Sequence, residues 1–516
     1  MADADSSSSA VRDFFKGANI FITGATGFLG MALIEKILRV CPDAGNIYLL
    51  VRPKKGKEIA TRVEELTKNP LYEKLIELRG SDVFQKLVAV AGDVGEDDLG
   101  LSPADKKLLV DNVNVVFHSA ATLDFEATFK ATVNINLLGT RRVVQLCKEM
   151  SHLKALVHVS SAYVNSNRKG GVEEVVYPAP EDAEKVIGLA TSLSEEALDD
   201  LTSKMLNDHP NMYTFTKALA EHEVVNAVSQ VPSAIIRPSM ITCAWKEPVP
   251  GWTNSKNGPT GFIMGAAKGV VRRLPISKDL VYDYIPVDIV INELMVAAWH
   301  VGSTRPQTTP VYHCTSSTIN PFRWVSVEHK LNGYLHKYPL KSAVWYPTLK
   351  LLPSLLLFRI SAIFVHFIPA YILDTVTRIF GGRPILVRLH TNVSNSLGRL
   401  APFIFSEWRF QNSHTKELQT KLTGSDKETF NLDISNLNWE EYFVNMAQGV
   451  RMYLNNEHPR TLPAAKRKDS ILMVMNVLVQ ALVFALIWWI GSIVLGTTMT
   501  KSSWIVVVAY ILFSFI

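Results

Sequence analysis

The chain lacks the patterns of a metal-binding or disulfide-stabilised protein. Only four of its 516 residues are cysteines, none lies in a C-x-x-C pair, and no group of histidines and cysteines has the spacing of zinc ligands. We therefore expect reduced thiols in a protein that faces the cytosol, and no bound metal. Cys147 and Cys243 lie on or near predicted core segments, and we assign them no role.

The chain also lacks a strong charge of either sign and a secretory leader. Lysine plus arginine (53) nearly balance aspartate plus glutamate (48), for a net charge of +5, whereas nucleic-acid binding calls for a concentrated basic face. We therefore expect no nucleic-acid partner, while an acidic ligand or an anionic membrane surface is compatible with this charge. Residues 1–15 have no basic region followed by an apolar run, so we interpret them as a short disordered tail.

Short β-branched runs alternate with longer amphipathic segments over the N-terminal half of the chain. The runs that predict buried strands are 18–23, 46–51, 87–91, 114–118, 155–160 and 233–237. The segments with helical periodicity include 28–40, 128–150 and 212–228. This alternation predicts an α/β fold with a Rossmann-like, doubly wound parallel sheet.

The remainder predicts a smaller, mainly helical C-terminal domain and a transmembrane segment. We expect the α/β domain at 16–320 and the helical domain at 321–460. The run 471–495 is uncharged and long enough for a helix to cross a bilayer with some tilt. The run Lys466-Arg467-Lys468 precedes it, and positive residues favour the cytosolic side, so we expect the folded domains to face the cytosol.

Two further apolar runs allow more than one interpretation. The run 504–516 is too short to span a bilayer alone, which predicts a re-entrant or interfacial end. The run 346–376 is interrupted by charged residues and prolines, which favours a helix pair that packs in the fold or lies at the membrane interface. A plain buried core explains that composition equally well.

The motif Thr-Gly-Ala-Thr-Gly-Phe-Leu-Gly at 23–30 directly follows the first predicted strand and opens the first helix. Gly24 allows a tight turn, Gly27 lets the backbone approach a pyrophosphate, and Gly30 lets the helix pack closely on the strand. The helix N-terminus then offers free N–H groups to phosphates. The predicted dinucleotide-binding residues here are Thr23, Gly24, Thr26, Gly27, Phe28, Leu29 and Gly30.

The end of the second predicted strand selects the cofactor. An acidic residue there would bind the ribose 2′-hydroxyl of NAD, but this strand ends Arg52-Pro53-Lys54-Lys55, whose cations suit a 2′-phosphate. NADPH is therefore the expected cofactor. Asp93, after the third strand, is placed to accept a hydrogen bond from the adenine amino group.

Tyr213 and Lys217 stand four residues apart near the start of a predicted helix, which places them on one helix face. A phenol titrates at about pH 10. A neighbouring ammonium, with the nicotinamide ribose, would favour the phenolate and make the tyrosine a useful proton donor at neutral pH. Ser160 and Ser161 end the preceding strand, and one of these hydroxyls is expected to bind the substrate oxygen. The spacing to Asn165 favours Ser160.

This combination resembles an extended short-chain dehydrogenase/reductase and, more narrowly, the eukaryotic fatty acyl-CoA reductases. The likeness covers nearly the whole chain and rests on the motifs at 23–30, 116–121, 159–165, 213–221, 258–272 and 283–288. It implies that NADPH reduces long-chain fatty acyl-CoA to an aldehyde and then to a fatty alcohol, with release of coenzyme A. Ser161 stands where many relatives carry threonine, and the hydroxyl is kept.

The resemblance also implies roles for single residues. Tyr213 acts as the acid, while Lys217 tunes it and holds the ribose. The further cofactor-binding residues that it implies are Ser119, Ala120 and Arg237. The candidates for binding the phosphates of coenzyme A, or else for a solvated helix face, are Lys268, Arg272 and Arg273. His118 is expected to line the nicotinamide region rather than to act in catalysis.

Other interpretations stay open at this point. A membrane-bound short-chain reductase of a sterol or a free aldehyde would share these motifs, although the helical domain argues against it. A non-catalytic NADPH-binding scaffold would share them too, although the Tyr/Lys pair argues against that. A lipid-membrane partner suits an acyl substrate, and both the endoplasmic reticulum and the peroxisome fit a tail-anchored reductase. The sequence leaves acyl chain length and oligomeric state open.

Overall fold

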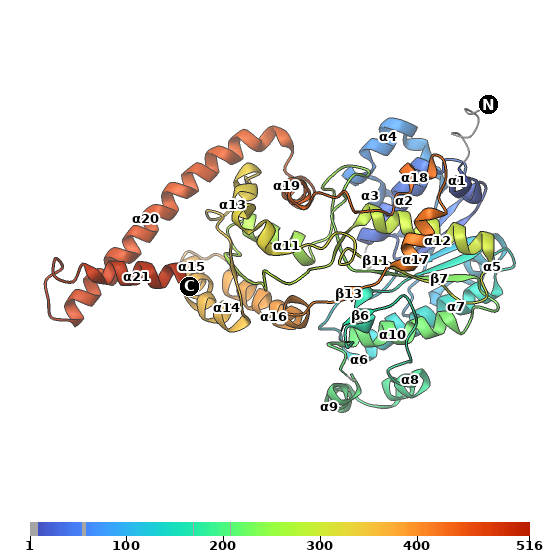
Figure 1. Cartoon of the computed structure of the whole chain (residues 1–516), viewed down its shortest axis with the longest axis horizontal. Helices are drawn as coiled ribbons and strands as arrows, with labels where there is room; N and C mark the ends of the chain where they lie inside the picture. The colour runs from blue at the N-terminus through green and yellow to red at the C-terminus, as the bar shows by residue number, and fades with distance from the viewer. Residues whose placement is uncertain (1–8, 54–57, 169, 207, 516) are drawn as a thin grey trace. The chain divides into compact units, whose positions relative to one another are not determined.

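The computed structural model describes residues 9–53, 58–168, 170–206 and 208–515 (Figure 1). Contacts divide the chain into two compact units, each built from separate stretches of sequence. The first unit comprises Met1–Thr253, Val281–Phe322 and Trp408–Asn438. The second comprises Asn254–Leu280, Arg323–Glu407 and Trp439–Ile516.

The first unit is built on a seven-stranded sheet in which every neighbouring pair is parallel. Its strands are β1 (Ile20–Thr23), β2 (Ile47–Val51), β3 (Leu87–Ala91), β4 (Val115–His118), β5 (Ala155–Val159), β7 (Ser233–Pro238) and β11 (Val311–Cys314). Their order is β11-β7-β5-β4-β1-β2-β3. The order changes direction between β1 and β4, which is the place where ligands bind in such sheets.

Helices cover both faces of this sheet (Figure 1). On one face α1 (Ala10–Phe15) and α2 (Phe28–Val40) pack against α12 (Val287–Thr304), and the ring of Phe117 lies 6.5 Å from that of Phe15. On the other face α5 (Pro103–Asn112), α7 (Gly139–Glu149) and α10 (Met212–Val225) share one core with Val116. Neighbouring residues of β4 thus point to opposite faces, as strand geometry requires.

The predicted doubly wound sheet is confirmed, and six of its strands match the expected runs to within two residues. The helix expected over 128–150 is instead α6 (Phe129–Thr132), a π-helical turn (Val133–Leu138) and α7. That turn places Asn136 where its Nδ2 donates to Thr216 Oγ1 of α10 at 3.2 Å. π-helical turns of this kind are frequent near functional sites.

Two sequence expectations about domain limits differ from the structure. The tail expected over 1–15 includes α1, whose Val11 and Phe15 are fully buried, because their apolar side chains complete the core beside α12. The sequence predicted two domains that follow one another along the chain, 16–320 and 321–460. The structure instead returns Trp408–Asn438 to the first unit, where α17 (Ser413–Thr420) packs on β11.

The second unit is mainly helical, as predicted. Its principal helices are α11 (Gly258–Ala267), α13 (Glu328–Lys337), α14 (Leu355–Ala362), α15 (Ile368–Ile379), α16 (Leu386–Ile404), α19 (Trp439–Gly449), α20 (Leu462–Val494) and α21 (Trp504–Phe515). One short parallel pair, β9 (Arg273–Pro275) with β12 (Lys350–Leu352), joins distant parts of this unit.

Two helical stretches of the described chain, Leu355–Ile379 and Pro459–Val494, are long and apolar enough to cross a membrane. The first includes α14 and α15, and its exposed apolar side chains, such as Leu356 (67%) and Ile379 (75%), argue against a plain buried core. The second contains α20. The short helix α21 folds back along it, with the ring of Tyr510 lying 6.1 Å from that of Phe484.

Candidate functional site

Glycines shape a cradle between β1 and α2. Gly24 has φ +74°, and a Cβ there would lie 2.8 Å from Ser119 Oγ and 2.9 Å from the backbone nitrogen of Ala120. A Cβ on Gly30 would lie 2.4 Å from the Gly24 carbonyl oxygen, so only hydrogen fits where α2 packs on the turn. Gly27 precedes the first residue of α2, is exposed, and brings no side chain to cap the helix.

Hydroxyl groups tie this cradle to β4. The Ser119 hydroxyl donates to the Thr23 carbonyl at 2.8 Å, and the Ala120 N–H donates to Thr23 Oγ1 at 3.2 Å. The same Thr23 Oγ1 lies 2.7 Å from His118 Nδ1, and His118 Nε2 lies 3.0 Å from Thr140 Oγ1. The structure therefore places Ser119 and Ala120 beside the glycine motif and makes His118 a buried lining group.

The cradle fits a dinucleotide pyrophosphate. A side chain at Gly24 would clash with Ser119 and Ala120 and distort the turn, and the uncapped N–H groups of the first turn of α2 present the positive end of the helix dipole there. Thr26 and Gly27 are exposed in the turn, and Phe28 and Leu29 are half-buried behind them. Of the expected residues of the motif, Thr26 and Gly27 are therefore the most accessible to a ligand, while Thr23 and Gly30 are buried beneath them.

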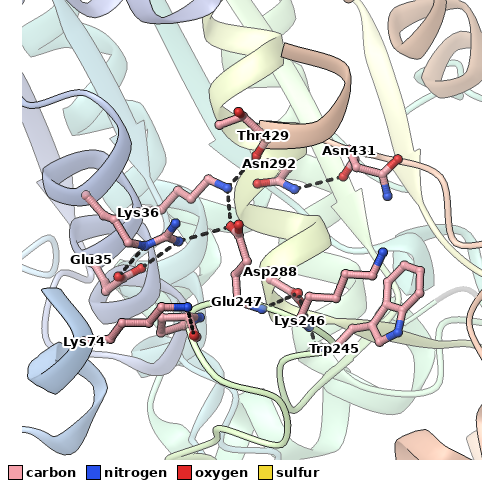
Figure 2. Close-up of polar contacts among 12 residues, drawn as sticks. Glu35, Lys36, Lys74, Trp245, Lys246, Glu247, Asp288, Asn292, Thr429 and Asn431 are labelled. Atoms are coloured by element: carbon pink, nitrogen blue, oxygen red, sulfur yellow. Dashed lines mark hydrogen bonds and ion pairs between the residues drawn. The ribbon is translucent and has the colours of Figure 1, made fainter. Parts of the chain in front are cut away.

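The loop that follows β8 (Met240–Thr242) is held firmly beside α2 (Figure 2). Asp288, in the first turn of α12, accepts hydrogen bonds at 2.8 to 3.1 Å from the backbone N–H groups of 245–247. Further along the loop the buried ring of Trp252 lies 5.3 Å from that of Phe28. Asp288 therefore fixes a loop that supports the glycine motif.

A charged cluster links the same loop to the outer face of α2 (Figure 2). Glu247 forms ion pairs with Lys36 and with Arg39, whose Nη2 lies 3.1 Å from the carboxylate. Lys36 also donates to the Thr429 carbonyl at 2.6 Å. Burial lowers the pKa of Lys36, although the Glu247 carboxylate opposes this. The cluster joins three separate stretches of the first unit.

Arg52 and Asp93 meet at the carboxyl ends of β2 and β3. Arg52 Nε lies 3.7 Å from Asp93 Oδ2, and the Arg52 side chain is exposed (70%). Exposed pairs of this kind add little stability, so the guanidinium stays available to a ligand. The predicted partners Lys54 and Lys55 lie outside the described residues.

Helix α10 carries the Tyr/Lys pair. Asn211 caps its N-terminus by accepting from the Thr214 N–H at 3.0 Å, which fixes where the helix begins. Tyr213 is half-buried, and its ring lies 6.0 Å from that of Phe125. Lys217 lies one turn further along and is 2% exposed.

Ser161 is the serine that meets Tyr213. Burial raises the pKa of Tyr213 to about 12, and a side-chain hydrogen bond with Ser161 opposes that rise. The sequence-based expectation that Lys217 lowers this pKa is wrong for the protein without ligands, because burial outweighs the other effects. The phenol therefore keeps its proton throughout the neutral range.

Ser160, the serine favoured by spacing, faces elsewhere. Its hydroxyl donates to Glu221 Oε1 at 2.6 Å in the protein interior. Arg237 binds the same carboxylate through two N–H groups at 2.8 and 2.6 Å, and also contacts His313. Arg237 is fully buried in the protein without ligands, and its expected role in cofactor binding stays a prediction. It neutralises a buried carboxylate, and breaking such a pair costs about 3–5 kcal/mol.

The Lys217 amine is enclosed by β5. Its Nζ donates to the Val159 carbonyl at 2.6 Å and lies 3.3 Å from His158 Nε2. Burial lowers the pKa of Lys217 to about 8, and the Glu221 carboxylate opposes this. The amine thus changes charge close to physiological pH.

Lys268 and Arg272 belong to the second unit. Lys268 ends α11 and is half-buried. Burial lowers the pKa of Arg272, whose buried Nε meets no partner among the described residues. Burial and neighbouring Arg272 lower the pKa of Arg273 to about 10. The three cations therefore form a crowded basic segment rather than a solvated helix face.

Sequence reasoning assigned no role to three residues that organise the site, Glu221, His158 and Asp288, although Glu221 and Asp288 end two of the motifs that carry the resemblance. Glu221 continues the four-residue spacing of Tyr213 and Lys217 on one face of α10, a signal that was present in the sequence. His158 interrupts a buried β-branched strand, which is also visible. The hydrogen-bond partners of Asp288 lie more than 40 positions earlier in the chain, so the residues around Asp288 do not predict these contacts.

The fold and this arrangement of Ser161, Tyr213 and Lys217 define the class of extended short-chain reductases. Among solved structures, the reductase domain of a non-ribosomal peptide synthetase from Mycobacterium tuberculosis superposes with TM-score 0.55 at 18% identity, covering 87% of this chain and 96% of that one. The terminal R domain of the myxalamid pathway superposes with TM-score 0.52 at 19% identity, covering 85% and 92%. These likenesses confirm the fold.

Sequence comparison supplies the family. The NAD-binding family described as "Male sterility protein" matches residues 22–294, and the Sterile family of the same description matches 365–457. A Drosophila melanogaster protein with the provisional name of a fatty acyl-CoA reductase is 53% identical, over 98% of this chain and 99% of its own length. Fatty acyl-CoA reductase 1 is 36% identical in Xenopus laevis and 35% in Homo sapiens, each over 97% of this chain and 96% of the relative. The chain belongs to the fatty acyl-CoA reductase family.

Proposed function

We propose that this protein reduces long-chain fatty acyl-CoA to fatty alcohol with NADPH. The observation that carries the proposal is the hydrogen bond between Ser161, which follows β5, and Tyr213 in the first turn of α10. Only β4 separates β5 from β1, the strand that leads into the glycine cradle. The pair supplies a hydrogen-bond donor and an acid next to a dinucleotide-binding turn. Family membership supports the acyl-CoA substrate.

The chain's own residues handle the substrate oxygen. When bound, the nicotinamide supplies a hydride to the carbonyl carbon of the thioester. The Ser161 hydroxyl binds the carbonyl oxygen and stabilises the negative charge that develops there. Tyr213, which keeps its proton at neutral pH, donates it to that oxygen. The resulting hemithioacetal loses coenzyme A and leaves an aldehyde.

The aldehyde has a carbonyl oxygen that Ser161 and Tyr213 can bind and protonate in the same way, and a second NADPH in the same site would supply the hydride that makes the alcohol. Lys217 carries a positive charge below about pH 8, and family membership supports its proposed role in holding the ribose. Arg52 supports NADPH over NADH because its exposed guanidinium suits a 2′-phosphate, and Asp93 beside it suits the adenine amino group.

Arg272 and Lys268 are the proposed contacts for the phosphates of coenzyme A. We expect Arg272→Gln to raise KM for acyl-CoA about tenfold or more, since a charge-assisted contact is lost. Reduction of a free long-chain aldehyde, which has no phosphates, is expected to stay unchanged. Steady-state kinetics on both substrates check this, with Arg323→Gln in the same unit as the matched control. Equal loss on both substrates would assign Arg272 a structural role.

A membrane location suits a protein that acts on a long acyl chain. We infer that α20 anchors the protein in a bilayer, with the basic residues at 466–468 on the cytosolic side. The exposed apolar side chains of α14 and α15 suit the membrane interface, where acyl chains partition. Both the endoplasmic reticulum and the peroxisome suit such an anchor.

The test is a product assay on the purified full-length protein in detergent. Acyl-CoA substrates of graded chain length are supplied with NADPH or NADH, and aldehyde, alcohol and free coenzyme A are measured. We expect alcohol and coenzyme A from long-chain substrates with NADPH. Absence of aldehyde and alcohol at every chain length, with turnover of a sterol or a free aldehyde instead, would overturn the proposed substrate.

A further inference from the structure

The buried ammonium of Lys217 has no carboxylate of its own. Glu221, one turn along α10, acts on it electrostatically, but the Glu221 oxygens already accept three hydrogen bonds from Arg237 and Ser160. Among the described residues, Lys217 Nζ contacts the Val159 carbonyl oxygen at 2.6 Å and His158 Nε2 at 3.3 Å. The charge therefore relies on two uncharged acceptors.

His158 contacts Lys217 through Nε2, and this orientation leaves its other ring nitrogen, Nδ1, without a hydrogen-bond partner in the described part of the chain. When Nε2 accepts from the ammonium, the ring proton must be on Nδ1, and Nδ1 is buried without a partner among the described residues. Burial, with the charge of Lys217, holds the pKa of His158 well below its usual range. The ring consequently stays neutral, and Nε2 keeps the lone pair that an ammonium needs.

The neighbouring histidine shows what an ordinary core histidine looks like here. His118 lies 5.2 Å from His158 between ring centres, yet both of its nitrogens meet threonine hydroxyls, those of Thr23 and Thr140. Burial lowers the pKa of His118 to about 3, so it adds no charge. An unsatisfied buried ring nitrogen costs stability, and only the contact with Lys217 compensates for it at His158.

We propose that His158 is a positioning residue for Lys217: its Nε2 holds the protonated amine against the Val159 carbonyl and keeps a positive charge at the cofactor site. This inference rests on the proposed function for its catalytic consequence. The groups that face the amine are His158 and Val159 of β5, His118 of β4 and Glu221 of α10, while Arg237 of β7 acts through Glu221.

The direction in which loss of His158 moves the pKa of Lys217 follows from which form of the amine His158 stabilises. Burial lowers the pKa of Lys217 to about 8, and the protonated amine is lost as pH rises through that value. Removing the His158 acceptor destabilises the protonated amine only, so the loss moves to lower pH. One charge-assisted hydrogen bond corresponds to about one pH unit or more.

The test compares His158→Leu, which lacks an acceptor, with His158→Gln, whose Oε1 can replace Nε2. NADPH binding to the full-length protein in detergent is followed by fluorescence between about pH 6 and pH 10, without acyl substrate. We expect the midpoint at which affinity falls to move down by about one unit in His158→Leu, with about fivefold weaker binding at pH 8 and about tenfold weaker binding at pH 9 and above. The glutamine variant is expected to restore both. The kcat profile should show the same shift.

His300→Gln is the matched control, because His300 is a half-buried histidine of the same unit that contacts Tyr312 rather than Lys217. Should His158→Leu fail to fold, His158→Met removes the strong acceptor with a flexible side chain. An unshifted midpoint in a folded variant, or a glutamine variant that behaves like leucine, would overturn the proposal. If His158→Leu shows the expected shift in NADPH binding but the wild-type protein turns over no acyl-CoA, only the proposed function would be overturned.

Discussion

Tyr213→Phe is expected to lower kcat about 10³-fold or more while NADPH still binds. Burial raises the pKa of Tyr213 to about 12, so the wild-type phenol is a protonated donor at neutral pH, and phenylalanine has no proton to give. The hydroxyl meets Ser161 rather than the glycine cradle, so cofactor affinity should hardly change. Product analysis measures the loss, and a fluorescence titration measures NADPH binding.

The control for this variant is Tyr312→Phe. Tyr312 lies on the edge strand β11, where its hydroxyl meets His300 at 2.9 Å, away from the Tyr/Lys pair. Its turnover is expected to match the wild type. Normal turnover in Tyr213→Phe would remove this residue from the mechanism, and parallel loss of NADPH binding would show that the substitution disturbs the whole site.

Ser161→Ala is expected to lower kcat about 10²- to 10³-fold, since removing one preorganised donor at a developing oxyanion has an effect of this size. Ser160→Ala should instead retain turnover and lower the free energy of unfolding by about 1–2 kcal/mol. Its hydroxyl binds Glu221, whose carboxylate would keep both hydrogen bonds from Arg237.

Steady-state kinetics and denaturant unfolding of the two alanine variants separate these effects. Ser161→Thr, which keeps a hydroxyl at that position, is expected to retain most of the activity and serves as the conservative control. The opposite pattern, with turnover lost in Ser160→Ala and kept in Ser161→Ala, would reverse the assignment and restore the interpretation from spacing.

Local patterns were sufficient for most of the sheet. The glycine motif at 23–30 predicted both the turn after β1 and the start of α2. These features depend on nearby residues only, because Gly24 adopts φ +74° and Gly30 has no room for a side chain. The edge strand β11 was not predicted. It pairs only with β7, more than 70 residues earlier in the chain, and its four residues carry little periodicity.

The proposed catalytic residues were harder to place because the direction of a side chain depends on its partners. Ser160 and Ser161 are adjacent and chemically identical, yet only the tertiary fold brings Glu221 and Arg237 to one of them and Tyr213 to the other. Arg237 ends the run 233–237, which the sequence predicted as a strand, and lies near the end of β7 in the structure. Its complete burial against a carboxylate is a property of packing rather than of sequence.

By itself the sequence determined the dinucleotide-binding turn, the Tyr213/Lys217 pair, the parallel sheet and the apolar C-terminal helix, since each depends on spacing within one or two elements. Only the tertiary structure decided which serine meets the tyrosine, where Arg237 points and how Lys217 is held. It also decided that Trp408–Asn438 returns to the first unit. The physical reason is that burial and hydrogen-bond partners are set by residues far apart in the chain, which the pattern of any one segment does not contain.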